Sequence, residues 1–261
     1  MRALYIAATG MQAQQMRVEV ISNNLANMST TAYNARRAEF ADLHYQQLAR
    51  AGTINSLTGA VLPAGVQLGL GVRASAVSMN VAQGALIATG GELDIAIDGA
   101  GYLEITLPSG VSAYTRDGTL KRGPDGQVVT SQGFALVPEI TIPEDARAIT
   151  INADGEVYAK FADQVDPQLL GRITLVSFTN QKGLEAIGDN LYLETTASGQ
   201  PLTGDPGTEG RGTLRQGYLE ESSVDAVREI TELIEAQRGY ELNAKVITAG
   251  DQMLAATTQI R

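Results

Sequence analysis

The sequence contains no cysteine, no tryptophan and a single histidine, His44. Without cysteine, the chain can form neither a disulfide bond nor a thiolate metal site. One histidine excludes metal sites that are built from several histidine ligands. We therefore expect His44 to have a plain surface or interface role. The absence of cysteine also suits a protein that stays unfolded for a time or travels outside the cytosol.

The chain also lacks apolar runs of membrane-spanning length and has little positive charge. Its net charge is −10. The first fifty residues, with five basic and three acidic side chains, have a net charge of about +2, so the rest of the chain carries about −12. Nucleic-acid-binding domains usually show a basic patch, which is missing here. We therefore predict no nucleic-acid partner and no membrane insertion. The N-terminus does not match a cleaved signal peptide, so we expect a cytosolic protein or export without cleavage.

Two short segments resemble ligand sites, but neither meets the chemical requirements. Residues 69–74 match the G-x-G-x-x-A spacing of a dinucleotide site, yet a strand-like pattern follows where the pyrophosphate needs a helix N-terminus. Residues 150–161 resemble a calcium loop, but Thr150 and Phe161 occupy its end positions and supply no carboxylate. The sequence therefore predicts no enzyme, no cofactor and no metal site.

A heptad pattern at the N-terminus predicts a helix over residues 4–25. Leu4, Met11, Val18 and Leu25 fall seven residues apart, with Ile21 between the last two. The apolar stripe is narrow, because Gln14 occupies one of the intermediate positions. Such a helix packs either on its own domain or on a partner at the far end of the chain or in another subunit. The asparagines that follow are expected to end the helix and fix the exit of the chain: Asn23, Asn24 and Asn27.

A second heptad pattern predicts a C-terminal helix that runs toward Ile260. Residues 222–225 form a capping-box pattern, and the apolar heptad positions that follow are Leu233, Tyr240, Ile247 and Leu254. Val227, Ile230 and Ile234 are expected to widen the apolar face at its start. Glycines interrupt both helices, and each costs about 1 kcal/mol relative to alanine. Packing must therefore hold these helices, and the glycines Gly10, Gly239 and Gly250 are expected to allow close helix approach.

Between the helices, short alternating segments and turn signals predict a β-rich region. Asp-Gly turns recur at residues 98–99, 117–118, 125–126 and 154–155, a spacing typical of a small sandwich or barrel. Residues 45–73 are expected to form a long extended loop that lies on another surface. The predicted fold is α+β, with the heptad helices paired as a coiled-coil-like inner domain. We expect a terminal-helix domain (1–30 with 223–261), a connecting segment (31–89 with 206–222) and a β-rich outer domain (90–205).

Both ends of the chain carry the motifs of a known family. The run from Ser22 to Thr30, SNNLANMST, is followed by an aromatic residue and two arginines, and Leu233–Lys245 reads LIEAQRGYELNAK. These segments resemble the flagellar basal-body rod and hook family. Ala32 and Gly239 depart mildly from its pattern, since the family usually has glycine at the first position and alanine or serine at the second. Length and the segment Tyr45–Arg73 favour the distal-rod members.

The resemblance implies a structural subunit of a rigid helical tube that transmits torque from the motor to the hook. It implies uncleaved export through the flagellar type III apparatus and assembly across the periplasm. Its partners would be further copies of itself, proximal rod proteins below, the hook above, and the surrounding P- and L-rings. The assembly interface would use Leu4, Met11, Val18, Ile21, Leu25, Asn23, Asn24, Asn27, Leu233, Tyr240, Ile247 and Leu254, and an inter-subunit loop would use Tyr45, Leu62, Pro63, Val66, Leu68 and Arg73.

Two alternatives remain open from the sequence. The first is a proximal rod or hook subunit, which shares the terminal motifs but differs in mechanics. The second belongs to another class: a calcium-binding or enzymatic β-domain protein of the cell surface with helical arms.

Overall fold

The computed structural model describes residues 2–49, 64–162 and 166–259. The chain divides into two compact units. The helical unit contains Met1–Ala26, Arg36–Ser78 and Asp225–Arg261, and the β-rich unit contains Asn27–Ala35 and Met79–Val224. Terminal helices that flank a β-rich middle confirm the predicted α+β fold class.

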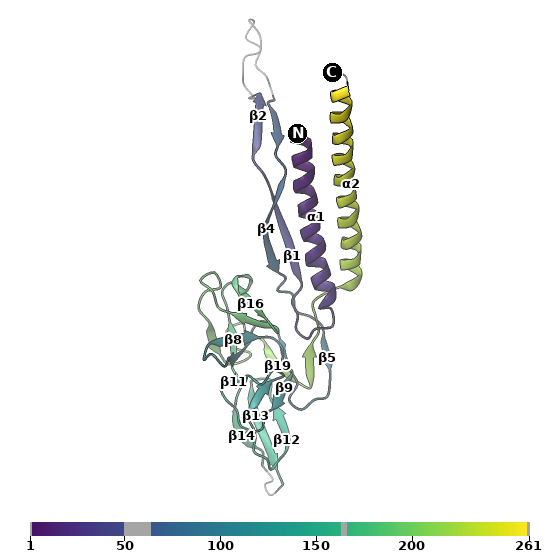
Figure 1. Cartoon of the computed structure of the whole chain (residues 1–261). Coiled ribbons are helices and arrows are strands. Elements are labelled where there is room, and N and C mark those ends of the chain that lie inside the picture. The colour runs from purple at the N-terminus through teal and green to yellow at the C-terminus, as the bar shows by residue number, and fades with distance from the viewer. Residues whose placement is uncertain (1, 50–63, 163–165, 260–261) are drawn as a thin grey trace. The chain divides into compact units, whose positions relative to one another are not determined.

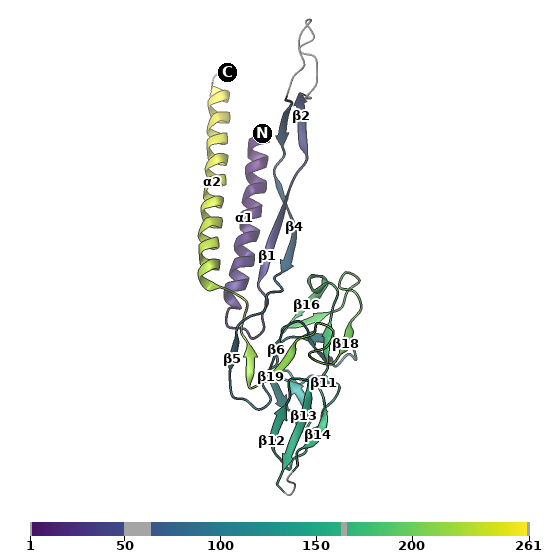
Figure 2. The same ribbon diagram turned by 180° about the vertical axis from the view of Figure 1, so that it is seen from behind.

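Two long helices lie side by side in the helical unit, with the chain termini at the same end of the pair (Figures 1 and 2). Helix α1 spans Arg2–Ala26 and helix α2 spans Ala226–Gln259, so the two helices run antiparallel. Asp225 begins α2 as its N-cap, because its Oδ1 accepts hydrogen bonds from the main-chain N–H groups of Val227 at 3.0 Å and Arg228 at 3.2 Å. The pattern at residues 222–225 therefore lies at the start of this helix, but the N-cap is Asp225 and not Ser222, the residue that a capping box would place there.

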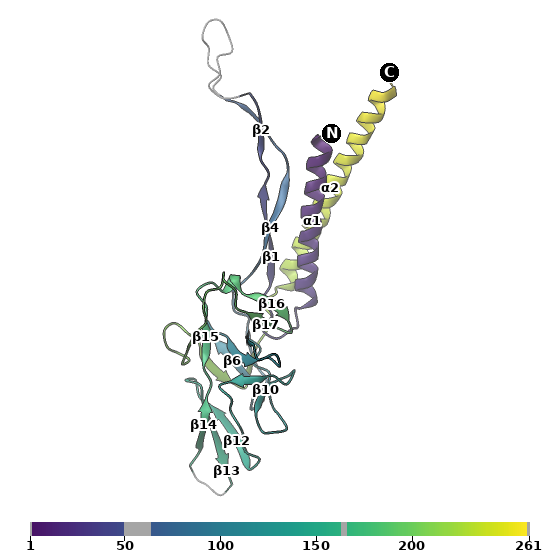
Figure 3. The same ribbon diagram turned by 60° about the vertical axis from the view of Figure 1, so that its left-hand side comes forward.

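A two-stranded ribbon accompanies the helices in the same unit (Figure 3). Strand β1 (Arg36–Asp42) pairs with β4 (Val72–Met79), and farther along β2 (Tyr45–Ala49) pairs with β3 (Val66–Gly69). The ribbon lies against α1 near Gly71, where the hydroxyl oxygen of Thr9 accepts the N–H of Val72 at 3.4 Å. The predicted loop over 45–73 is thus extended, but its two ends are hydrogen-bonded strands. Leu62 and Pro63 lie outside the described residues.

The β-rich unit is built on an antiparallel seven-stranded sheet with the order β16-β17-β8-β7-β11-β10-β9. A three-stranded sheet, β12-β13-β14, and the pairs β15-β18, β19-β6 and β20-β5 complete it. The strands are β5 (Leu86–Ala88), β6 (Ile95–Asp98), β7 (Leu103–Thr106), β8 (Ser112–Thr115), β9 (Leu120–Arg122), β10 (Val128–Thr130), β11 (Ala135–Val137), β12 (Ala146–Ile151), β13 (Glu156–Phe161), β14 (Gln168–Arg172), β15 (Leu175–Ser177), β16 (Glu185–Gly188), β17 (Leu191–Leu193), β18 (Leu202–Gly204), β19 (Thr213–Gln216) and β20 (Tyr218–Glu220).

Two clusters of buried side chains hold the β-rich unit together. The larger one is aliphatic and includes Ile97, Leu103, Leu136 and Leu175, in agreement with the alternating apolar pattern of the sequence. The smaller one is aromatic: the rings of Tyr102, Tyr114, Phe178 and Tyr192 pack edge-to-face around it. Burial raises the pKa of Tyr102 to about 12, although the nearby Arg116 charge partly offsets that rise. This unit therefore has a core of its own.

Candidate assembly interface

The seam between α1 and α2 is formed where a glycine on one helix meets a side chain on the other. A β-carbon placed on Gly10 would lie 2.9 Å from Oδ1 of Asn243, and one on Gly239 would lie 3.1 Å from Cδ of Gln14. A β-carbon on Gly250 would lie 2.7 Å from Cδ2 of Leu4. Moving along α1 from Leu4 to Gly10 and Gln14, the contacted residue of α2 moves back from Gly250 to Asn243 and Gly239, as antiparallel packing requires. The expected close approach of the helices at these glycines is present within one chain.

Much of this seam is polar. Arg17 of α1 contacts two carboxylates of α2, Glu232 at 3.3 Å and Glu235 at 3.6 Å. The side-chain Oε1 of Gln14 is buried and has no hydrogen-bond partner among the residues that the structure describes. Partly exposed ion pairs contribute only about 0–1 kcal/mol, and an unpaired buried carbonyl destabilises. The intrachain pairing of the helices is therefore weak for its length.

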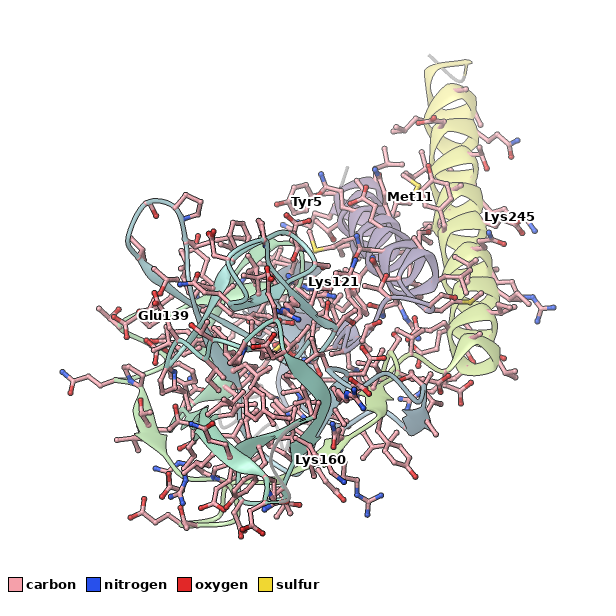
Figure 4. The ribbon with its side chains drawn as sticks, turned by 90° about the horizontal axis from the view of Figure 1, so that it is seen from below. Tyr5, Met11, Lys121, Glu139, Lys160 and Lys245 are labelled. Carbon is pink, nitrogen blue, oxygen red and sulfur yellow. The ribbon has the colours of Figure 1, made fainter. Side chains whose placement is uncertain are left out.

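The predicted apolar interface residues fall into three groups by burial. Met11 lies on the side of α1 that faces α2, whereas Tyr5 points away from α2 and Lys245 lies on the far side of that helix (Figure 4). Ile21 is buried, whereas Tyr240 and Leu254 remain exposed. The rest are half-buried: Leu4, Met11, Val18, Leu25, Leu233 and Ile247.

A second apolar stripe on α2 is exposed to solvent. Val227, at 77% exposure, lies with Ile230 and Ile234 on one side of the helix, because residues three and four apart share a face. The sequence suggested that these residues widen the heptad face. Instead they form a separate stripe that no described part of this chain covers. This stripe is the clearest candidate contact surface that heptad counting alone would miss.

Asn24 ties together three elements of the helical unit. Its side chain is only 1% exposed, and its Oδ1 accepts the N–H of Arg36 at 2.8 Å. Its Nδ2 donates to the main-chain oxygen of Arg36 at 2.8 Å and to Oε2 of Glu229 at 3.2 Å. Burial raises the pKa of Glu229, and the hydrogen bond from Asn24 partly offsets that rise. The end of α1, the start of β1 and the first turn of α2 therefore meet at one amide.

The other two predicted asparagines occupy different environments. Asn23 is exposed, and Asn27 is half-buried, with its Oδ1 accepting a hydrogen bond from the hydroxyl of Thr30 at 3.2 Å. Ala32 farther along has a positive φ of 53°, a conformation that costs an alanine more than a glycine. This gives a physical reason for the glycine that the family pattern usually has there.

The predicted inter-subunit loop residues lie on the ribbon where they are described. Tyr45, Val66 and Leu68 are large apolar side chains left exposed on β2 and β3, and Arg73 on β4 is exposed as well. Leu48 of β2 is equally exposed and was not singled out from the sequence. The ribbon therefore presents apolar surface without a partner from its own described residues.

Metal-binding clusters and membrane-spanning helices are both absent from the residues that the structure describes. No group of three or more histidine, cysteine, aspartate or glutamate residues within 2–49, 64–162 and 166–259 could hold a metal ion. Within the same ranges, no helix is both long enough and apolar enough to cross a membrane.

Comparison with known proteins identifies the family. The model described as flagella basal body rod protein matches residues 4–33, the flagellar hook protein FlgE/F/G D1 domain matches 96–159, and the flagellar basal body rod FlgEFG protein C-terminal matches 215–260. The flagellar basal-body rod protein FlgG of Caulobacter vibrioides is 53% identical over 261 residues, which is 100% of both chains.

Two further relatives show how far the similarity extends. FlgG of Agrobacterium fabrum is 48% identical over 99% of both chains, and the flagellar hook-basal body complex protein FlhP of Bacillus subtilis is 32% identical over 100% of both. The terminal motifs and the whole-chain identity agree. The chain belongs to the FlgG family of flagellar basal-body rod proteins, which are structural subunits of the distal rod.

Proposed function

We propose that this chain polymerises into a rigid tube that carries torque from the flagellar motor to the hook, and that it has no enzymatic activity. The observation that carries the proposal is the construction of the helix pair. Its seam is polar and interrupted by glycines, while Val227, Ile230 and Ile234 remain exposed on the outer side of α2. Such a pair is poorly stabilised alone and gains apolar burial when copies pack together.

A place in the distal rod implies further partners for this chain. Copies of the chain would contact proximal rod proteins at one end and hook proteins at the other, and the P- and L-rings would surround the polymer. The subunit would pass unfolded and uncleaved through the type III export apparatus and assemble across the periplasm. The ribbon residues Tyr45, Val66 and Leu68 would lie on neighbouring subunits and resist sliding between them.

A proximal rod or hook subunit is the second candidate of the same class. The relatives favour the distal rod, because identity to FlgG of C. vibrioides is 53% and identity to the hook-basal body complex protein FlhP is 32%. A calcium-binding or enzymatic surface protein has no supporting observation among the described residues.

Complementation tests this proposal. A flagellated strain whose own distal-rod gene is deleted should recover motility and straight rods, seen by electron microscopy of purified basal bodies, when it expresses this chain. A variant lacking residues 56–65 should still assemble but should give rods that bend, since a shortened segment 45–73 could no longer span neighbouring subunits. Basal bodies that stop at the proximal rod despite normal export of the chain would contradict the proposal, and rods of unchanged straightness would contradict the role of the ribbon.

A further inference from the structure

A buried ion pair lies in the β-rich unit, away from the helix pair. Arg116 follows β8 and is 7% exposed, and Glu220 ends β20 and is 4% exposed. The Nη2 and Nε atoms of Arg116 donate to Oε2 of Glu220 at 2.7 and 3.0 Å. Charged side chains are rarely buried to this degree unless each charge is paired and hydrogen-bonded. The arrangement therefore calls for a reason beyond filling the core.

Both members of the pair are bonded further to main-chain groups. Arg116 donates through Nη1 to the main-chain oxygens of Gly99 at 3.2 Å and Gly101 at 3.0 Å, and its Nη2 also reaches the oxygen of Gly99 at 3.1 Å. The second carboxylate oxygen of Glu220, Oε1, accepts the N–H of Gly84 at 3.0 Å. Gly84 itself tolerates no side chain, because a β-carbon there would overlap the main-chain oxygen of Glu221. One ion pair thus holds two further stretches of main chain, at residues 99–101 and at Gly84.

Glu220 also bonds to the segment that follows α1 in the chain. The main-chain oxygen of Glu220 accepts the N–H of Ala32 at 2.8 Å. Three residues on, Ser223 donates its N–H to the oxygen of Tyr33 at 2.9 Å and accepts the N–H of Ala35 on its hydroxyl at 2.9 Å. The oxygen of Ala35 in turn accepts the N–H of Asn80 at 2.8 Å.

These bonds coincide with the places where the chain passes between its two units. The backbone crosses after residues 26, 35, 78 and 224. On the β-rich side, the crossing segments are Asn27–Ala35, the residues from Met79 onward and the residues up to Val224. All of them are hydrogen-bonded to one another within a few residues of Glu220. Glu220 is therefore hydrogen-bonded directly, at Ala32 and at Gly84, to two of the β-rich segments that lead to the helical unit, and it lies in the third.

We propose that Arg116 and Glu220 form a joint that fixes the four chain crossings as one rigid block within the β-rich unit. This proposal rests on the proposed torque-bearing function, because a shaft subunit needs connections that do not flex under load. The simpler alternative is that the ion pair only adds stability to the core of the β-rich unit. The two roles differ in which amides they protect from hydrogen exchange. A joint protects the amides of the crossing segments specifically, whereas a core contact protects those of the whole unit equally.

Residue-resolved amide hydrogen exchange on the purified chain distinguishes a joint from a core contact. Arg116→Met should raise the exchange rates of the Ala32 and Gly84 amides at least about tenfold more than that of Ile105, which lies in the central strand β7. Because Arg116→Met leaves a buried carboxylate, the double variant Arg116→Met/Glu220→Met should recover overall stability. It should nevertheless keep fast exchange at Ala32 and Gly84.

Arg172→Met is the matched control, since it breaks an exposed ion-pair cluster with Glu156 and Asp205 in the same unit. It should leave exchange at Ala32 and Gly84 unchanged. Equal acceleration at Ile105, or recovery of slow exchange at Ala32 in the double variant, would overturn the joint. The measurement needs no polymer, so a failure of the joint is separable from a failure of the chain to build rods.

Discussion

Gly10→Leu abolishes rod assembly and motility if the two helices pair as the structure shows. Even a β-carbon at this position would lie 2.9 Å from Oδ1 of Asn243, and the three further carbons of leucine would force the helices apart. Overpacking of this kind costs roughly 1–3 kcal/mol, which outweighs the gain of about 1 kcal/mol in helix propensity. Because the seam is weak to begin with, a loss of this size should leave few paired helices. Motility in soft agar and counts of complete rods by electron microscopy measure the effect.

A second-site change provides the control for this prediction. Asn243→Ala removes the amide that meets position 10, and its Nδ2 bonds only to the oxygen of Gly239 on its own helix among the hydrogen bonds in the described structure. The double variant Gly10→Leu/Asn243→Ala should therefore regain part of the assembly. Normal rods from Gly10→Leu alone would show that the helices do not approach each other at this residue.

Asn24→Ala should lower the free energy of unfolding of the helical unit by roughly 2–4 kcal/mol, since it leaves the N–H and oxygen of Arg36 without their partner. Urea unfolding of assembled rods, in which the helix pair is stabilised by packing, measures this loss through the helix signal in circular dichroism. Gln12→Ala is the control, because it shortens an exposed polar side chain of the same helix, and it should change stability by less than about 0.5 kcal/mol. Equal effects of the two changes would contradict the role of Asn24.

Replacement by aspartate gives this prediction a pH signature. Asn24→Asp keeps an acceptor for the N–H of Arg36 but places a carboxylate beside Glu229, whose pKa is already raised by burial. Repulsion between the two carboxylates raises both pKa values further in the folded state. The folded state then binds protons more readily than the unfolded state, so the destabilisation should be largest at neutral pH and should shrink as the pH falls through the raised pKa values.

The sequence predicted the helices well because periodicity and capping are local signals. Heptad positions such as Leu4 and Leu233 predicted an apolar face, and the pattern at residues 222–225 placed the start of α2 to within three residues. Periodicity states which face is apolar but not what covers it, so the choice between an intrachain and an intersubunit partner stayed open. The glycines resolve it in part, since Gly10, Gly239 and Gly250 each meet a residue of the other helix in one consistent register.

Long-range features could not be predicted in the same way. β2 and β3 are separated by residues 50–65 and lack a short turn signal, so their pairing left no hairpin pattern to recognise. Arg116 and Glu220 are 104 residues apart, and Arg116 looks in the sequence like one more residue of an Arg-Asp-Gly turn. Asn24 was singled out as a helix-ending residue, but its contact with Glu229, 205 residues away, required the fold.

The central claim is that α1 and α2 of one chain pair antiparallel in this register, and a disulfide cross-link tests it most directly. The chain has no native cysteine, so Gly10→Cys/Asn243→Cys introduces a unique pair at positions that already touch. Oxidised rods should yield monomers with an internal disulfide, seen as a mobility shift that reduction reverses. The pair Gly10→Cys/Gly250→Cys, displaced by about 10 Å along α2, should not cross-link. Internal cross-linking of the displaced pair, or only intermolecular products from the matched pair, would contradict the account.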